Sequence, residues 1–137
     1  MILVDTSVWI DLFNGLDSQE SLTLQRLIID GNSVSICELV LTEILQGIKN
    51  DDAYMRSKEI LLKFSCVKTV GIDTYVAAAD IYRKCRKGGK TIRSTVDCII
   101  AAICIENNLE LLHKDRDFDI IAQCTKLKVL RADKKYY

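Results

Sequence analysis

Short apolar runs alternate along the chain with longer segments in which apolar residues recur every three or four positions. The short runs predict strands at residues 1–4, 34–36, 66–70, 110–113 and 127–130. The periodic segments predict helices at residues 6–13, 18–30, 38–48, 53–64, 74–86, 94–107 and 118–123. Strands that alternate with helices favour a mainly parallel sheet covered on both faces. Because crossovers between parallel strands are right-handed, we expect a doubly wound, three-layer α/β/α sandwich.

Length and composition are those of one globular domain. The 137 residues include no proline, and no repeat or low-complexity stretch marks a linker, so we expect a single domain over residues 1–137 with a peripheral tail from about residue 131. The longest apolar run, residues 98–105, is shorter than the roughly 18 residues that a membrane span needs. The first residues also lack the pattern of a secretory signal. These features predict a cytoplasmic protein that does not enter the membrane.

Charge and cysteine content exclude some chemistries. The 19 basic and 19 acidic residues balance, so no overall field indicates a nucleic-acid partner. None of the six cysteines forms a Cys-x-x-Cys pair, and several lie inside apolar runs. Zinc sites usually use cysteine or histidine ligands in closely spaced pairs, and disulfides are rare in cytosolic chains of this size. We therefore expect reduced, buried thiols.

Acidic residues stand where the predicted strands end and the next helices begin. Asp5 follows the first strand, and Asp115 and Asp117 follow the strand that ends at residue 113. Asp97 lies in the first turn of the helix at 94–107, and Glu43 lies early in the helix at 38–48. Strand carboxyl ends and helix amino ends share one edge of such a sheet, where ligands bind. We therefore expect these carboxylates to converge.

Helix capping is an alternative role for most of these acids. Asp5 precedes the helix at 6–13, and Asp115 or Asp117 precedes the helix at 118–123. Asp97 stands three residues after Ser94, which is the spacing of a capping box.

Glu43 is not explained by capping. It lies at the border of the apolar arc of its helix, with no lysine or arginine within a turn on that side. A carboxylate there is costly to desolvate unless it is paired or binds a cation. Several carboxylates that converge without a basic partner repel one another. Oxygen ligands without histidine or cysteine suit Mg²⁺ or Mn²⁺, and such ions serve phosphate chemistry in nucleases.

Four segments resemble, in order, the motifs of PIN-domain ribonucleases. They are residues 4–9 (VDTSVW), 42–47 (TEILQG), 97–102 (DCIIAA) and 113–118 (HKDRDF). Chain length and motif order are similar to those of the VapC-type toxins of bacterial toxin–antitoxin pairs. The resemblance covers residues 1 to about 121, and four motifs at this spacing are specific.

The resemblance implies a metal-dependent ribonuclease. Its acidic quartet would be Asp5, Glu43, Asp97 and Asp115, with Ser7 as an auxiliary polar residue. The last motif fits either Asp115 or Asp117 as the fourth acid; we favour Asp115 and leave Asp117 as auxiliary. Mg²⁺ or Mn²⁺, held mainly by Asp5 and Asp97, would activate water to hydrolyse RNA and leave a 5′-phosphate.

One dense basic stretch precedes the third motif. Arg86, Lys87, Lys90 and Arg93 are candidate contacts to RNA phosphates, because Arg93 leads directly toward Asp97. The alternative is a solvated helix end, where cations interact favourably with the helix dipole.

Partners are indicated by the helices at 38–48 and 53–64. The first is apolar over most of its circumference, and burial in the core explains much of this pattern. The antitoxin-binding groove that the resemblance implies near these helices explains the remainder, and the resemblance also implies a homodimer.

The lone histidine, His113, is expected to be a loop residue beside the site. The competing function is a catalytically silent PIN-like module that binds RNA or protein, which the presence of all four acids disfavours.

Overall fold

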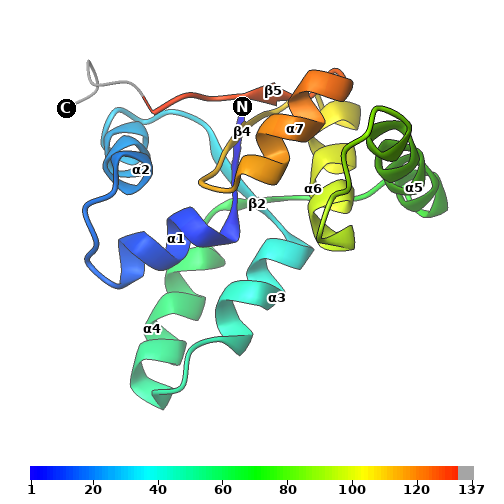
Figure 1. The fold of residues 1–137 in the computed structure, drawn as a ribbon. Coiled ribbons are helices and arrows are strands. Elements are labelled where there is room, and N and C mark those ends of the chain that lie inside the picture. Colours follow the sequence, from blue (N-terminus) through cyan, green and yellow to red (C-terminus); the bar gives the residue numbers. More distant parts are fainter. Residues whose placement is uncertain (133–137) are drawn as a thin grey trace.

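Within residues 1–132, five short parallel strands form the centre of the fold (Figure 1). The computed structural model describes residues 1–132, so residues 133–137 of the predicted peripheral tail lie outside the described residues. The sheet has the order β3-β2-β1-β4-β5, and every pair of neighbours is parallel. The strands are β1 (Ile2–Val4), β2 (Val34–Cys37), β3 (Ser65–Val67), β4 (Glu110–Leu112) and β5 (Lys128–Val129).

Seven helices cover the two faces of this sheet within the described part of the chain. They are α1 (Thr6–Phe13), α2 (Gln19–Ile29), α3 (Glu38–Gln46), α4 (Asp51–Leu61), α5 (Ile72–Lys87), α6 (Thr95–Glu106) and α7 (Arg116–Cys124). Helices α1 to α4 contact one another, and α5 to α7 form a second group (Figure 1). The predicted three-layer, doubly wound sandwich is confirmed. No helix in residues 1–132 has the length and apolar character needed to cross a membrane.

Side-chain caps explain where several helices begin. Asn50 accepts a hydrogen bond from the Ala53 backbone, so α4 begins at Asp51, before the predicted residue 53. Asp115 accepts from the Asp117 backbone in the same way, and α7 therefore begins at Arg116 and not at residue 118. The two edge strands are shorter than predicted, because each has a partner on one side only.

The core lies between the sheet and both helical layers. Trp9 is fully buried on α1, where its ring meets Phe64 edge-on at 5.0 Å and Phe13 at 6.0 Å. Four cysteines, Cys37, Cys85, Cys98 and Cys104, are buried as expected. The expectation of burial is wrong for Cys66, which is exposed on edge strand β3, and Cys124 is half-buried at the end of α7.

The direction in which successive strands are added to the sheet reverses between β1 and β4. From β1 the chain steps through β2 to β3 along one side of the sheet, and it then crosses back to β4 on the other side of β1. Helices therefore leave β1 and β4 toward opposite faces, which opens a crevice at the carboxyl ends of these two strands. Asp5 follows β1, and Asp115 follows β4 after a short turn.

Trp9→Ala tests how much α1 depends on this packing. We expect the free energy of unfolding to fall by about 3–5 kcal/mol, because a large buried ring leaves a cavity. The Trp9 Nε1 atom has no hydrogen-bond partner among the described residues, so Trp9→Phe should cost clearly less. Urea denaturation of the two variants measures the difference, and equal losses would show that packing of the ring does not dominate.

Candidate active site

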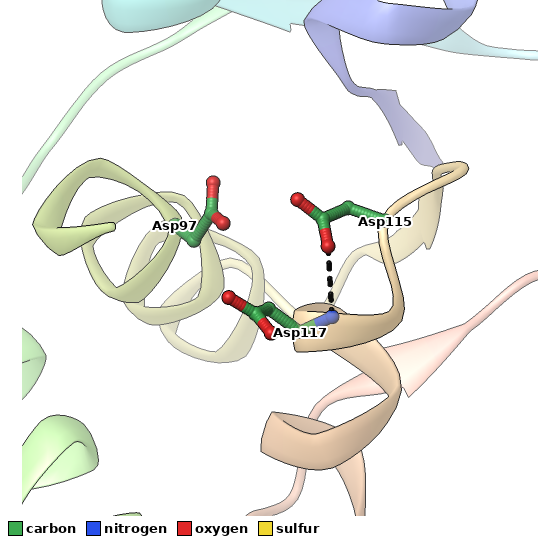
Figure 2. Close-up of side chains that lie close together, drawn as sticks. All are labelled: Asp97, Asp115 and Asp117. Atoms are coloured by element: carbon green, nitrogen blue, oxygen red, sulfur yellow. Dashed lines mark hydrogen bonds between the residues drawn. The ribbon is translucent and has the colours of Figure 1, made fainter. Parts of the chain in front are cut away.

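Three carboxylates come together at the crevice, one from α6 and two from the start of α7 (Figure 2). Asp97, Asp115 and Asp117 each offer an oxygen, and these oxygens all lie within 4.8 Å of one another. Asp97 lies in the first turn of α6, Asp115 is the N-cap of α7, and Asp117 lies in its first turn. We call these three residues the acidic cluster.

Backbone geometry holds the two α7 members of the cluster. The Asp117 N–H donates to Asp115 Oδ1 at 2.9 Å, which caps the helix. Asp117 itself is 4% exposed. The capping role considered for Asp115 is therefore present, and it uses one carboxylate oxygen while the residue stays in the cluster.

Arg93 is a basic partner that the sequence pattern did not reveal. Its backbone N–H and its Nε both donate to Asp117 Oδ2, at 3.2 and 3.3 Å. Its Nη2 lies 3.5 Å from Asp115 Oδ1. The expectation that these carboxylates converge without a basic partner is thus wrong. The available signal was the position of Arg93 one residue before the α6 N-cap, but its side-chain direction is set by tertiary structure.

Asp5 and Glu43 line the same crevice but lie outside the acidic cluster. Asp5 is buried, and the Ser7 hydroxyl donates to its Oδ2 at 3.2 Å. Glu43 on α3 accepts a hydrogen bond at 2.8 Å from the hydroxyl of Thr6, the first residue of α1. The role of Thr6 was missed, although a hydroxyl residue directly after Asp5 was a signal for it. Hydroxyl groups thus orient both carboxylates.

Capping does not explain Asp5 or the position of Asp97. Asp5 stands at the N-cap of α1 without a side-chain capping hydrogen bond. Ser94, the N-cap of α6, also makes none, so the capping box proposed for Ser94 and Asp97 is not formed by the serine. Helix capping therefore does not account for the position of these two carboxylates at the crevice.

Burial and mutual repulsion raise the pKa of two of these carboxyls. Burial raises the pKa of Asp5 to about 6, and the charge of Glu43 adds to this effect. Burial raises the pKa of Asp97 to about 7, helped by the charges of Asp5, Asp115, Asp117 and Glu43. The four other carboxylates whose charges act on Asp97 also give the site an excess of negative charge. An oxygen-only donor set with such an excess fits a hard divalent cation.

The predicted basic contacts lie on the surface beyond the cluster. Arg86 and Lys87 are exposed in the last turn of α5, as the solvated helix-end interpretation requires, and Lys90 is exposed after it. Arg86 stands over the Tyr82 ring at 5.6 Å. Arg93, in contrast, already has partners in the acidic cluster.

His113 and Lys114 sit beside the crevice. The His113 side chain is only 7% exposed, packs against Phe118 and pairs with Asp119 at 3.3 Å. The expected loop histidine is thus largely buried, and burial lowers its pKa. Lys114 bonds Asp11 on α1.

Helix α3 is apolar chiefly because it packs into the core. Val40 and Ile44 are buried, and most of its other apolar residues pack against the core. A hollow of about 260 Å³ remains between α1 and the end of α3. It is lined by Ile10, Phe13 and Asn14 from α1 and its C-cap, and by Ile44 and residues 47–50.

Residues 2–123 match the PIN domain family. This chain belongs to the PIN domain family. It is 34% identical over 129 residues to the VapC ribonuclease Mb1587 of Mycobacterium bovis and to ribonuclease VapC11 of Mycobacterium tuberculosis. Each alignment covers 93% of this chain and 96% of the relative. The resemblance drawn from the four motifs is confirmed.

Solved structures share the fold of this PIN domain. VapBC2 from Rickettsia felis, bound to a DNA fragment from its promoter, matches with a TM-score of 0.74 and 18% identity over 95% of this chain and 98% of that one. A toxin–antitoxin complex from Klebsiella pneumoniae matches with a TM-score of 0.68 and 23% identity over 86% and 90%.

The raised pKa values of Asp5 and Asp97 predict how metal-free stability depends on pH. Both folded-state values lie above the ordinary value of 3.8, so the folded state binds more protons than the unfolded state between about pH 4 and pH 7. The contribution of these groups to stability therefore falls as pH rises through that window.

We expect Asp97→Asn to remove part of this dependence. Thermal melting in EDTA from about pH 5 to about pH 8 measures it, with Asp17→Asn at an exposed position as the control. A pH profile of Asp97→Asn identical to that of the wild type would contradict the raised pKa of Asp97.

Proposed function

We propose that this PIN domain is a metal-dependent endoribonuclease that acts as the toxin of a toxin–antitoxin pair. The observation that carries the proposal is the convergence of Asp97, Asp115 and Asp117, with Asp5 and Glu43 beside them, at one crevice. The relatives that cover nearly the whole chain are named VapC ribonucleases, which supports the same activity.

The cation of this site would be Mg²⁺ or Mn²⁺. The residues that would hold it are Asp97, Asp115 and Asp117, with Asp5 and Glu43 completing the acidic lining. Hard oxygen donors without nitrogen or sulfur favour these ions over zinc. When bound, such an ion neutralises the charge that builds on the scissile phosphate and lowers the pKa of water. Both Asp115 and Asp117 belong to the acidic cluster, so we assign a ligand role to both instead of choosing one fourth acid.

The remaining residues position this machinery and bring RNA to it. Ser7 and Thr6 orient the carboxylates of Asp5 and Glu43 through their hydroxyl groups. Water is the proposed nucleophile, and hydrolysis would leave a 5′-phosphate on the released RNA fragment. Arg86, Lys87 and Lys90 would contact backbone phosphates, which offsets the repulsion between RNA and an acidic crevice.

An antitoxin protein is the proposed partner, and a second copy of the chain is proposed to complete a homodimer. The hollow between α1 and α3 ends at Asn50, the N-cap of α4, and α4 exposes the apolar side chains of Met55 and Ile60. Such a surface suits the apolar side of a partner helix. The Klebsiella structure, which shares this fold, is a toxin–antitoxin complex. We propose that the protein acts in the cytoplasm, where RNA is available.

A catalytically silent binding module is the competing function. It would keep the fold and the basic surface but would not need five carboxylates at one crevice. Cation-dependent RNA cleavage by the purified protein separates the two functions.

Asp97→Asn tests the catalytic role of the acidic cluster. Asparagine keeps the shape of aspartate, but it removes a negative charge and is a poorer ligand for a hard cation. We expect RNA cleavage to fall by about 10²–10³-fold, as for other losses of one preorganised electrostatic element. A normal melting transition should accompany the loss.

The matched control is Asp17→Asn, an exposed acid outside the crevice. It should cleave like the wild type. If Asp97→Asn cleaves within a few-fold of wild type and a mock preparation does not, the acidic cluster is not the catalytic site.

The basic surface is tested by replacing Arg86, Lys87 and Lys90 with alanine. We expect the log–log slope of RNA affinity against salt to fall by roughly 0.7 for each RNA phosphate that the variant no longer binds. The melting shift caused by Mn²⁺ should not change. Arg93 is left intact because it bonds the acidic cluster.

A variant with the same net charge provides the comparison. Lys49, Arg56 and Lys63 are exposed in and beside α4, and replacing all three with alanine should leave the salt slope intact. Equal slopes for both triple variants would show that the end of α5 is a solvated surface and not an RNA contact.

A further inference from the structure

Arg93 joins the two helices that carry the acidic cluster. It lies one residue before the N-cap of α6, which bears Asp97, and it bonds both α7 members of the cluster. Its backbone N–H and Nε converge on one oxygen, Asp117 Oδ2. Its Nη2 faces one oxygen of the neighbouring carboxylate, Asp115 Oδ1, which also accepts the Asp117 N–H.

These contacts divide the oxygens of the two carboxylates into two sets. Asp117 Oδ2 and Asp115 Oδ1 are engaged by Arg93 and the α7 backbone. Among residues 1–132, no hydrogen bond engages the second oxygen of either residue, and Asp97 faces both carboxylates (Figure 2). The free oxygens are therefore available to a cation in a fixed orientation.

We propose that Arg93 is a positioning residue for the cation site, which it serves by holding Asp115 and Asp117, and that it is not an RNA contact. The inference rests on the proposed function, because it assumes that a divalent cation binds the acidic cluster. This role differs from the RNA contact that the basic stretch in the sequence had suggested for Arg93.

The chemistry of arginine fits this role. A planar guanidinium presents several N–H donors in a fixed fork and can bridge two carboxylates, whereas a lysine ammonium acts as a point charge. Groups that orient metal ligands commonly change metal affinity by 10–100-fold when they are removed. The Arg93 side chain is 73% exposed, so its replacement should leave the core intact.

Two other roles for Arg93 make different predictions. As a phosphate contact, it would affect the salt dependence of RNA binding but not cation affinity. As a competitor that occupies the cluster, it would lower cation affinity, and its removal would strengthen cation binding.

The experiment measures Mn²⁺ affinity without RNA, from the shift in melting temperature during a Mn²⁺ titration of the full chain. Arg93→Lys and Arg93→Gln are compared with wild type. We expect both variants to bind Mn²⁺ about 10-fold more weakly or worse. The salt slope of RNA affinity, measured in EDTA, should match that of wild type.

Arg116 supplies matched control variants. It is exposed, lies between Asp115 and Asp117 in the sequence, and makes no ion pair within the described residues. Arg116→Lys and Arg116→Gln therefore change the same charge near the cluster without removing the clamp. Both should bind Mn²⁺ like wild type.

Several outcomes would overturn the proposal. Mn²⁺ affinity within two-fold of wild type in both Arg93 variants would exclude positioning, and stronger binding would identify Arg93 as a competitor. Normal affinity in Arg93→Lys with a loss only in Arg93→Gln would show that charge alone matters. A wild-type protein whose melting temperature does not respond to Mn²⁺ would instead overturn the proposed metal site itself.

Discussion

Repulsion among carboxylates gathered at one crevice is the constraint on which this structure depends. Five acids reach the carboxyl edge of the sheet from β1, α3, α6 and α7. Burial and mutual charge raise the pKa of Asp5 and Asp97. Such an arrangement lowers the stability of the metal-free protein near neutral pH. The carboxylates thus destabilise the metal-free protein, and a bound cation would restore that stability. Perturbed pKa values of this kind are common at functional sites.

The fold creates this constraint and also supports it. The crevice opens between β1 and β4 because the direction in which successive strands are added to the sheet reverses at that point. The same strands are central and have neighbours on both sides, and the apolar residues that follow them, such as Trp9 and Phe118, are fully buried. A rigid base of this kind keeps the acids close despite their repulsion.

Local partners then limit the freedom of each acid. Hydroxyl groups from Thr6 and Ser7 hold Glu43 and Asp5, and both come from the start of α1. Asp115 caps α7, and Arg93 holds Asp117. Each interaction uses part of a carboxylate, and none replaces a divalent cation, because a single arginine carries one positive charge against five acids. The site is therefore orientated while its charge remains mostly uncompensated.

The amino-acid sequence was enough to predict the order of strands and helices, the parallel sheet and the gathering of the acids at one edge. Apolar runs and helical periodicity are local patterns, and right-handed crossovers leave few ways to connect them. Helix starts at Asp51 and Arg116 and the exposure of Cys66 were not predicted, since caps and edge positions become visible only when neighbours are known.

At the crevice, the sequence by itself determined which acids gather there, and the tertiary structure decided how they are grouped. Asp97 lies with Asp115 and Asp117, whereas the resemblance implied a cation held mainly by Asp5 and Asp97. Arg93 and Thr6 entered the site through side-chain directions that no spacing encodes. Strand ends place a residue at an edge, but distances of a few ångströms between side chains depend on how α6 and α7 pack against each other.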